Sequence, residues 1–221
     1  MTFINELTIA FSANANTENA QYMQDYMKGL FSFYGIKTDQ RRKLFKAAWD
    51  NHKTEIKANC RNIAKELYAK QKRDYHYCAI EILVKELKKN FVKEDIELID
   101  YLITHNSWWD SVDTIAKYLL GAYLQQFPQE TETVIERFSN SNNMWLNRSA
   151  ILFQLGYKNN TNKDILFSEC IKHKNSKEFF IQKAIGWALR EYGKVNPDAV
   201  REFVKTAGLK PLSTREALKN L

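Results

Sequence analysis

The chain has 221 residues, of which 44% are hydrophobic, and its 33 Lys and Arg against 26 Asp and Glu give a formal net charge of +7. Only 7 Gly and 3 Pro are present, which argues against a β-sandwich or barrel because those folds need many tight turns. The three cysteines, Cys60, Cys78 and Cys170, are too far apart for a disulfide framework or a zinc motif, and no apolar run could span a membrane, so we expect a cytoplasmic protein.

Helical periodicity dominates the chain, and no segment alternates with period two over the length of a strand. In the segment from Lys93, the apolar residues Ile96, Ile99, Leu102 and Ile103 recur at helical spacing. Helix starts are predicted, in chain order, near Thr17, Thr38, Thr54, Arg73, Lys93, Ser107, Pro128, Asn143, Asn162, Ser176, Pro197 and Ser213. The sequence therefore predicts an all-α fold.

The predicted helices form pairs that repeat with a period in the mid-thirties. The first helices of successive pairs begin 37, 39, 35, 34 and 35 residues apart, and the second helices 35, 34, 36, 33 and 37 residues apart. Such a period is typical of helical-repeat solenoids, in which neighbouring pairs stack into one core. We therefore expect a single domain over residues 1–221, built as a curved solenoid of about six helical pairs.

A polar column at a spacing of 35 residues runs through the second helices. The column consists of Cys78, Asp113, Arg148 and Lys183. Equal spacing predicts that these side chains occupy the same point on successive helices, which usually line the concave wall of a solenoid. Trp109 lies one helical turn before Asp113, and Trp187 lies one turn after Lys183, so both tryptophans should face the same groove. The neighbouring Trp108 is rotated by about 100° and is assigned to the core.

The chemistry-bearing residues narrow the possible activities. There is no glycine-rich phosphate loop, no G-x-S-x-G motif and no HExxH. What remains is a carboxylate near two large aromatic side chains and several cations, which suits the stabilisation of a short-lived cation such as a sugar oxocarbenium ion. Each residue taken singly would more often be an ordinary core or surface residue, and only the combination on one groove favours a site.

The positive charge is concentrated toward the C-terminus. Residues 1–140 contain 19 Lys and Arg against 19 Asp and Glu, whereas residues 141–221 contain 14 against 7, so the whole surplus of +7 lies in the last third. A basic surface of this kind fits a polyanionic partner, and on charge alone it fits a merely solvated surface equally well.

Three segments resemble the DNA alkylation repair glycosylases of the AlkD type. They are Ser107–Asp113 (SWWDSVD), Ala150–Leu155 (AILFQL) and Ser176–Trp187 (SKEFFIQKAIGW). The resemblance runs from about Tyr22 to the C-terminus. It implies a HEAT-like repeat enzyme, monomeric and without a metal or cofactor, that excises N3- and N7-alkylated purines from double-stranded DNA without a deep pocket for an extruded base.

The resemblance also implies roles for individual residues. The catalytic carboxylate falls on Asp113, the cleft tryptophans on Trp109 and Trp187, a phosphate-contacting arginine on Arg148, and a tyrosine near the lesion on Tyr26. Arg148 and Lys183 are expected to hold backbone phosphates near the lesion, and Arg190, Lys158 and Lys194 are weaker candidates for which a solvated surface is an equal alternative. Lys37 stands where a close relative has a neutral amide, and we expect it near the opposite strand.

The alternative is a non-catalytic repeat module that binds nucleic acid or a protein partner, because a fold does not fix a function. The carboxylate of Asp113 favours catalysis over this alternative, since a negative charge on a phosphate-binding wall costs affinity.

Overall fold

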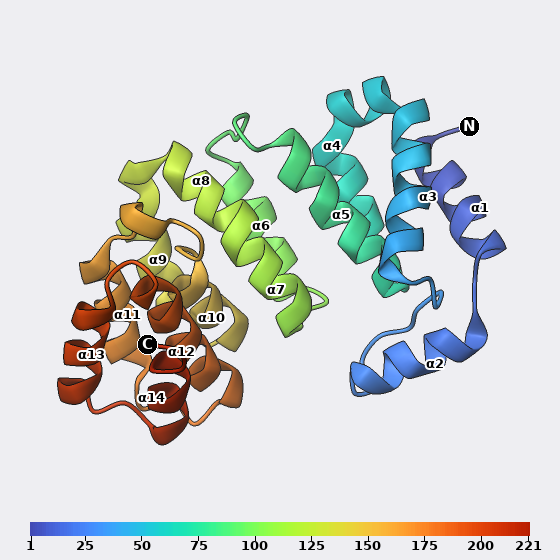
Figure 1. Ribbon diagram of the computed structural model, residues 1–221. Coiled ribbons are helices and arrows are strands. Elements are labelled where there is room, and N and C mark those ends of the chain that lie inside the picture. The colour runs from blue at the N-terminus through green and yellow to red at the C-terminus, as the bar shows by residue number, and fades with distance from the viewer. The chain divides into compact units, whose positions relative to one another are not determined.

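A computed structural model describes residues 1–221, and it is all-α apart from one isolated β-bridge between Ser32 and Lys72. The chain forms two compact units, residues 1–90 and residues 91–221 (Figure 1). None of its helices combines the length and the apolar character that crossing a membrane requires. The predicted all-α class is confirmed, whereas the curved solenoid of about six repeats and the single domain stay predictions.

The first unit contains five α-helices. They are α1 (Phe3–Ala13), α2 (Thr17–Tyr26), α3 (Thr38–Asn51), α4 (Lys53–Tyr68) and α5 (Arg73–Glu86). The starts of α2 to α5 agree with the predicted ones to within one residue. The predicted first pair is wrong, however, because α1, which the predicted pairs do not include, packs along α3, and α2 fully buries no side chain. Helix α1 packs there because Phe3, Leu7 and Phe11 recur every four residues and are all fully buried.

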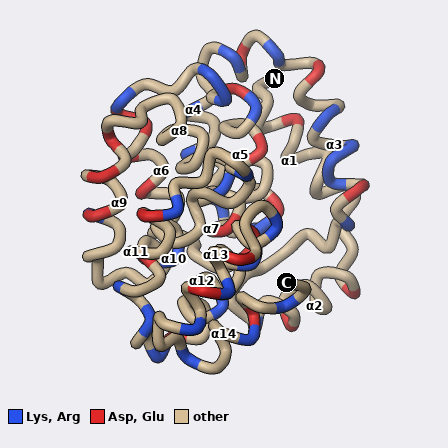
Figure 2. The backbone as a smooth tube through the Cα atoms, turned by 60° about the vertical axis from the view of Figure 1, so that its left-hand side comes forward, with Lys and Arg blue, Asp and Glu red and all other residues tan.

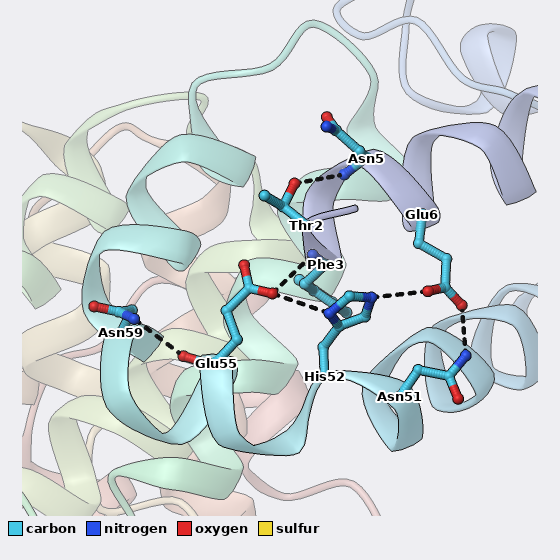
Figure 3. A network of polar contacts seen from close by, with 8 residues as sticks. All are labelled: Thr2, Phe3, Asn5, Glu6, Asn51, His52, Glu55 and Asn59. Carbon is cyan, nitrogen blue, oxygen red and sulfur yellow. Dashed lines mark hydrogen bonds and ion pairs between the residues drawn. The ribbon is translucent and has the colours of Figure 1, made fainter.

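A polar network ties α1 to the junction of α3 and α4 (Figure 3). The imidazole of His52 lies between two carboxylates, with Nε2 at 2.8 Å from Glu6 Oε2 and Nδ1 at 3.0 Å from Glu55 Oε2. The Glu55 carboxylate also accepts a hydrogen bond from the backbone N–H of Phe3 at 3.0 Å. Hydrogen bonds from Asn51 and His52 lower the pKa of Glu6 below its ordinary value of 4.5, so this carboxylate is ionised in the folded protein over most of the pH range.

The second unit is built from the remaining helices. They are α6 (Asp95–Thr104), α7 (Trp109–Ile115), α8 (Gly121–Gln126), α9 (Thr131–Ser139), α10 (Met144–Leu152), α11 (Lys163–His173), α12 (Phe179–Gly193), α13 (Pro197–Thr206) and α14 (Pro211–Ala217), with short 3₁₀ turns at Pro128–Glu130 and Lys158–Asn160. Observed helix starts differ from the predicted ones by at most three residues. Successive helices pack as the predicted pairs, and α12 also lies along α14 and α10.

Helices α7 and α8 form one continuous helix, because the segment that joins them, Ala116–Leu120, is a π-helix with helical backbone at both ends. π-Segments are rare, occur mostly as single turns inside α-helices, and are frequently found at functional sites. This one begins three residues after Asp113.

Helix α12 has two faces. Its apolar residues Ile181, Ala184, Ile185, Ala188 and Leu189 are buried in the core of the second unit, against residues of α10, α11, α13 and α14. The other face carries polar and aromatic side chains, and it contributes to the pocket described next.

Candidate functional site

The second unit contains a pocket of about 390 Å³ between side chains of α7, α10, α12 and α14. Its lining consists of Trp109, Asp113, Arg148, Phe179, Phe180, Lys183, Trp187, Arg190 and Glu216. Six of these nine are the site residues that the sequence analysis placed in this part of the chain. Asp113, Arg148 and Lys183 thus share one surface, as the spacing of 35 residues predicts.

Helix α7 brings one tryptophan to the pocket and keeps its neighbour out. Trp109 and Asp113 are one turn apart and both line the pocket. Trp108 instead packs among aromatic rings, with its centroid 5.7 Å from that of Trp145 and 5.1 Å from that of Phe180. The indole Nε1 of Trp108 is buried without a hydrogen-bond partner. Trp109 therefore lines the pocket as predicted, whereas Trp108, which was assigned to the core, is only half-buried among these rings.

Asp113 and Arg148 form a bidentate ion pair. Arg148 Nε donates to Asp113 Oδ1 at 2.7 Å and Nη2 donates to Oδ2 at 2.9 Å, while Nη1 donates to the carbonyl of Phe180. Only 14% of the Asp113 side chain and 5% of the Arg148 side chain are exposed. Burial raises the pKa of Asp113 above its ordinary value of 3.8, and the hydrogen bonds from Arg148 oppose that shift. The Arg148 side chain is therefore bonded to Asp113 in this structure, and contact of Arg148 with a phosphate stays a prediction.

A second ion cluster joins α12 to α14, and both helices carry basic and acidic residues (Figure 2). Lys183, Trp187 and Arg190 are spaced four and three residues apart, so they share one face of α12. Glu216 of α14 accepts from Lys183 Nζ through Oε1 at 2.8 Å and from Arg190 Nη1 through Oε2 at 2.9 Å. These two hydrogen bonds lower the pKa of Glu216 to about 2, so its carboxylate is ionised at neutral pH.

Three lining residues were not among the predicted site residues, and two of them had a signal. Phe179 is 70 residues after Trp109, two repeats along the same column, and Phe180 is 35 residues after Trp145. Glu216 is 33 residues after Lys183 and so falls outside the column, which is why spacing alone does not reveal it.

The remaining predicted DNA contacts lie elsewhere. Tyr26, at the end of α2, and Lys37, just before α3, are exposed residues of the first unit, and Tyr26 lines a separate pocket of about 380 Å³ together with Tyr22, Arg41 and other side chains. Lys158 and Lys194 do not line the pocket of the second unit. The DNA contacts of these residues stay predictions.

The pocket of the second unit is weakly positive, since Arg148, Lys183 and Arg190 outnumber Asp113 and Glu216 by one charge. Every one of these charges has an opposite partner within hydrogen-bonding distance. Histidine, cysteine and carboxylate side chains nowhere form a group of three that could hold a metal ion. The site can therefore offer ionised carboxylates, aromatic faces and cations to a ligand that carries both a developing positive charge and phosphates.

The chain is similar to known proteins over nearly its whole length. Residues 7–221 match the sequence model of a family described as DNA alkylation repair enzyme. A solved structure described as a predicted DNA alkylation repair enzyme from Enterococcus faecalis is 36% identical, with 94% of this chain and 96% of that chain covered and a TM-score of 0.85. No curated protein matches the chain.

Proposed function

The chain belongs to the DNA alkylation repair enzyme family, and from this premise we propose that it is a DNA glycosylase that excises N3- and N7-alkylated purines from double-stranded DNA. The observation that carries the proposal is the pocket that combines the Asp113 carboxylate with Trp109 and Trp187. A carboxylate beside aromatic faces stabilises a positive charge, and cleavage of an N-glycosidic bond creates such a charge on the deoxyribose.

The substrate class is the one that the resemblance to the alkylation repair glycosylases implies, and the groups of the pocket suit it. Alkylation at N3 or N7 makes the purine cationic, so it leaves as a neutral base without a general acid. The bond from C1′ of the sugar to the base breaks, the electron pair leaves with the base, and water adds to C1′ while losing a proton. The protein needs only to stabilise the sugar cation and to admit the water.

Asp113 has the first of these tasks. Its ionised carboxylate stabilises the charge that moves onto the sugar, and it orients the attacking water as a hydrogen-bond acceptor. Arg148 is essential to that state, because burial alone would favour the protonated acid, and two hydrogen bonds from the guanidinium favour the carboxylate.

Trp109 and Trp187 flank the sugar in this proposal. A cation over the face of an indole ring is stabilised by about 0.5–2 kcal/mol, which is less than a full negative charge contributes. Lys183 and Arg190 hold the DNA backbone beside them.

The alternative is a repeat module that binds nucleic acid or a protein and catalyses nothing. One observation favours it, namely that Asp113 is bonded by Arg148 through both oxygens, as a purely structural ion pair would be. The two functions differ in one outcome, because only the glycosylase releases base.

The test is a single-turnover release assay on duplex DNA with one N7-methylguanine. We expect the protein to release free 7-methylguanine and leave an abasic site, and we expect Asp113→Asn to release it roughly 100-fold more slowly. Asp198→Asn, on α13 and outside the pocket, with a side chain that is 91% exposed, is the matched control and should release base at the wild-type rate. Tight binding of the damaged duplex without any release would support the alternative.

A further inference from the structure

The cluster of Lys183, Arg190 and Glu216 is held in place by a close approach of two helices. A Cβ atom on Gly186 would lie 2.4 Å from the Cβ of Glu216 and 2.9 Å from the carbonyl oxygen of Ser213, so only glycine allows α14 to come this near to α12. Gly186 lies three residues after Lys183 and four before Arg190, which puts it on the same helical face. The contact therefore sets the Glu216 carboxylate between the two cations.

The carboxylate is not needed to join the helices. Gly186 allows direct contact, Ser213 Oγ donates to the carbonyl of Gln182 at 3.0 Å, and Arg190 also donates to the backbone carbonyl of Glu216 at 2.9 Å. Ala217 and Ser213 are fully buried in the same interface. The packing of α14 on α12 thus does not rest on the Glu216 carboxylate alone.

The charges of the cluster point to its ligand. Two cations and one carboxylate leave a net charge of +1, which matches the single negative charge of one phosphodiester. The side chains of Lys183 and Arg190 are 37% and 25% exposed, whereas the guanidinium of Arg148 is engaged by Asp113 and almost fully buried. The accessible cations of the pocket are therefore those on α12, on either side of Trp187.

We propose that Glu216 is the positioning residue of Lys183 and Arg190, and that it presents both cations together to one backbone phosphodiester. Glu216 holds both long side chains at one point, so that their remaining N–H groups bind the phosphate without a search through rotamers. It also removes one unit of positive charge, which limits binding to undamaged DNA. The proposal rests on the proposed function for the identity of the ligand as DNA.

The experiment compares Glu216→Gln with Glu202→Gln. Both changes raise the net charge by one, and Glu202 lies outside the pocket on α13, 70% exposed and paired only with Lys205 at 3.5 Å. Binding of each variant to an undamaged duplex is measured by fluorescence anisotropy over a series of salt concentrations, and release of N7-methylguanine is measured in single turnovers at saturating protein.

For Glu216→Gln we expect a salt dependence steeper by up to about 0.9 in the slope of log K against log salt, as for one further phosphate contact. Affinity for undamaged DNA at low salt should rise several-fold, and base release at saturation should fall roughly 10-fold because the phosphate is no longer held in one place. Glu202→Gln should match the wild type in both measurements.

A Glu216→Gln variant that binds more weakly with an unchanged salt slope would overturn the proposal, because the carboxylate would then serve only the packing of α14. Release at the wild-type rate would overturn it as well. If the wild-type protein releases no base at all, the proposed glycosylase function fails, and the salt slopes on undamaged DNA still decide whether Lys183 and Arg190 bind a phosphate under the control of Glu216.

Discussion

Replacement of Asp113 by asparagine changes one oxygen of the pocket into an NH₂ group and removes one negative charge. Asp113 accepts from Arg148 through both oxygens, at 2.7 and 2.9 Å. The amide can preserve one of these hydrogen bonds through its oxygen, but its nitrogen then faces an N–H of the guanidinium, donor against donor. Arg148 stays buried and keeps the bond to the Phe180 carbonyl.

The magnitudes can be worked from this geometry. Loss of one hydrogen bond between charged groups costs about 1.5–3 kcal/mol, and complete loss of a buried partner costs about 3–5 kcal/mol. We therefore expect Asp113→Asn to lower the free energy of unfolding by about 2–4 kcal/mol, which a domain of typical stability tolerates. The effect on catalysis is separate. A 100-fold loss of base release corresponds to about 2.7 kcal/mol of transition-state stabilisation.

The assay separates these effects. Thermal unfolding measures the change in stability, and release of 7-methylguanine is followed at a temperature where wild type and variant are both folded. DNA binding should be retained or become tighter, because a charge that repels phosphates is gone. The loss of rate should be largest for alkylated purines that leave DNA slowly by themselves, since these depend most on the protein.

The pH dependence gives an independent check. Because burial raises the pKa of Asp113 above 3.8, base release by the wild type should decline on acidification at a pH above that value, and Asp113→Asn should lack this decline. If the variant is folded and releases base at the wild-type rate, Asp113 is not the catalytic group and the assignment of the pocket as the active site is wrong.

Four further substitutions test other parts of the structure. Arg148→Ala should weaken binding to DNA of any sequence and flatten the salt slope by about 0.9, because it removes the net positive charge of the pocket. It should also lower the free energy of unfolding by about 3–5 kcal/mol, since a buried carboxylate loses its partner. Salt-dependent anisotropy measures the first effect and thermal unfolding the second. Trp109→Ala and Trp187→Ala should each slow base release by less than loss of the carboxylate does, in the same single-turnover assay, and a larger loss would mean that the rings do more than stabilise charge. Glu6 has a folded-state pKa below its ordinary 4.5, so the stability it contributes is present above pH 4.5 and is lost as the pH falls through the lowered pKa. Glu6→Gln should therefore show a smaller drop in melting temperature below pH 4.5 than the wild type. An unchanged drop would contradict the network of Figure 3.

Most of the helices and six of the nine residues that line the pocket could be predicted from the periodicity of the sequence. Helix starts were predictable because the signals that mark them are local. Pro128 and Pro197 fit the backbone geometry of a first helical turn, and the apolar spacing reflects the helical period. The column of Asp113, Arg148 and Lys183 was predictable because equal spacing on similarly packed helices brings side chains to one surface. Such features require no knowledge of which partner a helix has.

The rest depends on partners that spacing does not encode. The apolar face of α1 is visible in the sequence, but nothing local shows that α1, and not α2, packs along α3. Glu216 reaches the pocket because Gly186 allows α14 to approach α12 closely, which is a tertiary contact. Similarly, the spacing predicts that Asp113 and Arg148 are neighbours, whereas their burial decides that they bond to each other before they bond to a ligand.

The π-segment Ala116–Leu120 has a consequence for changes in chain length. A π-turn spans one residue more per hydrogen bond than an α-turn, so this segment accommodates a surplus residue between Asp113, which faces the pocket, and Gly121, where a Cβ would lie 2.4 Å from the Phe153 carbonyl oxygen. A deletion elsewhere in the helix would rotate all later residues by about 100° and move one of these contacts out of place. Loss of one residue within the π-segment would instead convert it to α-helix with both ends retained, which makes it the position in this helix where a homologue can differ by one residue in length and keep the same fold.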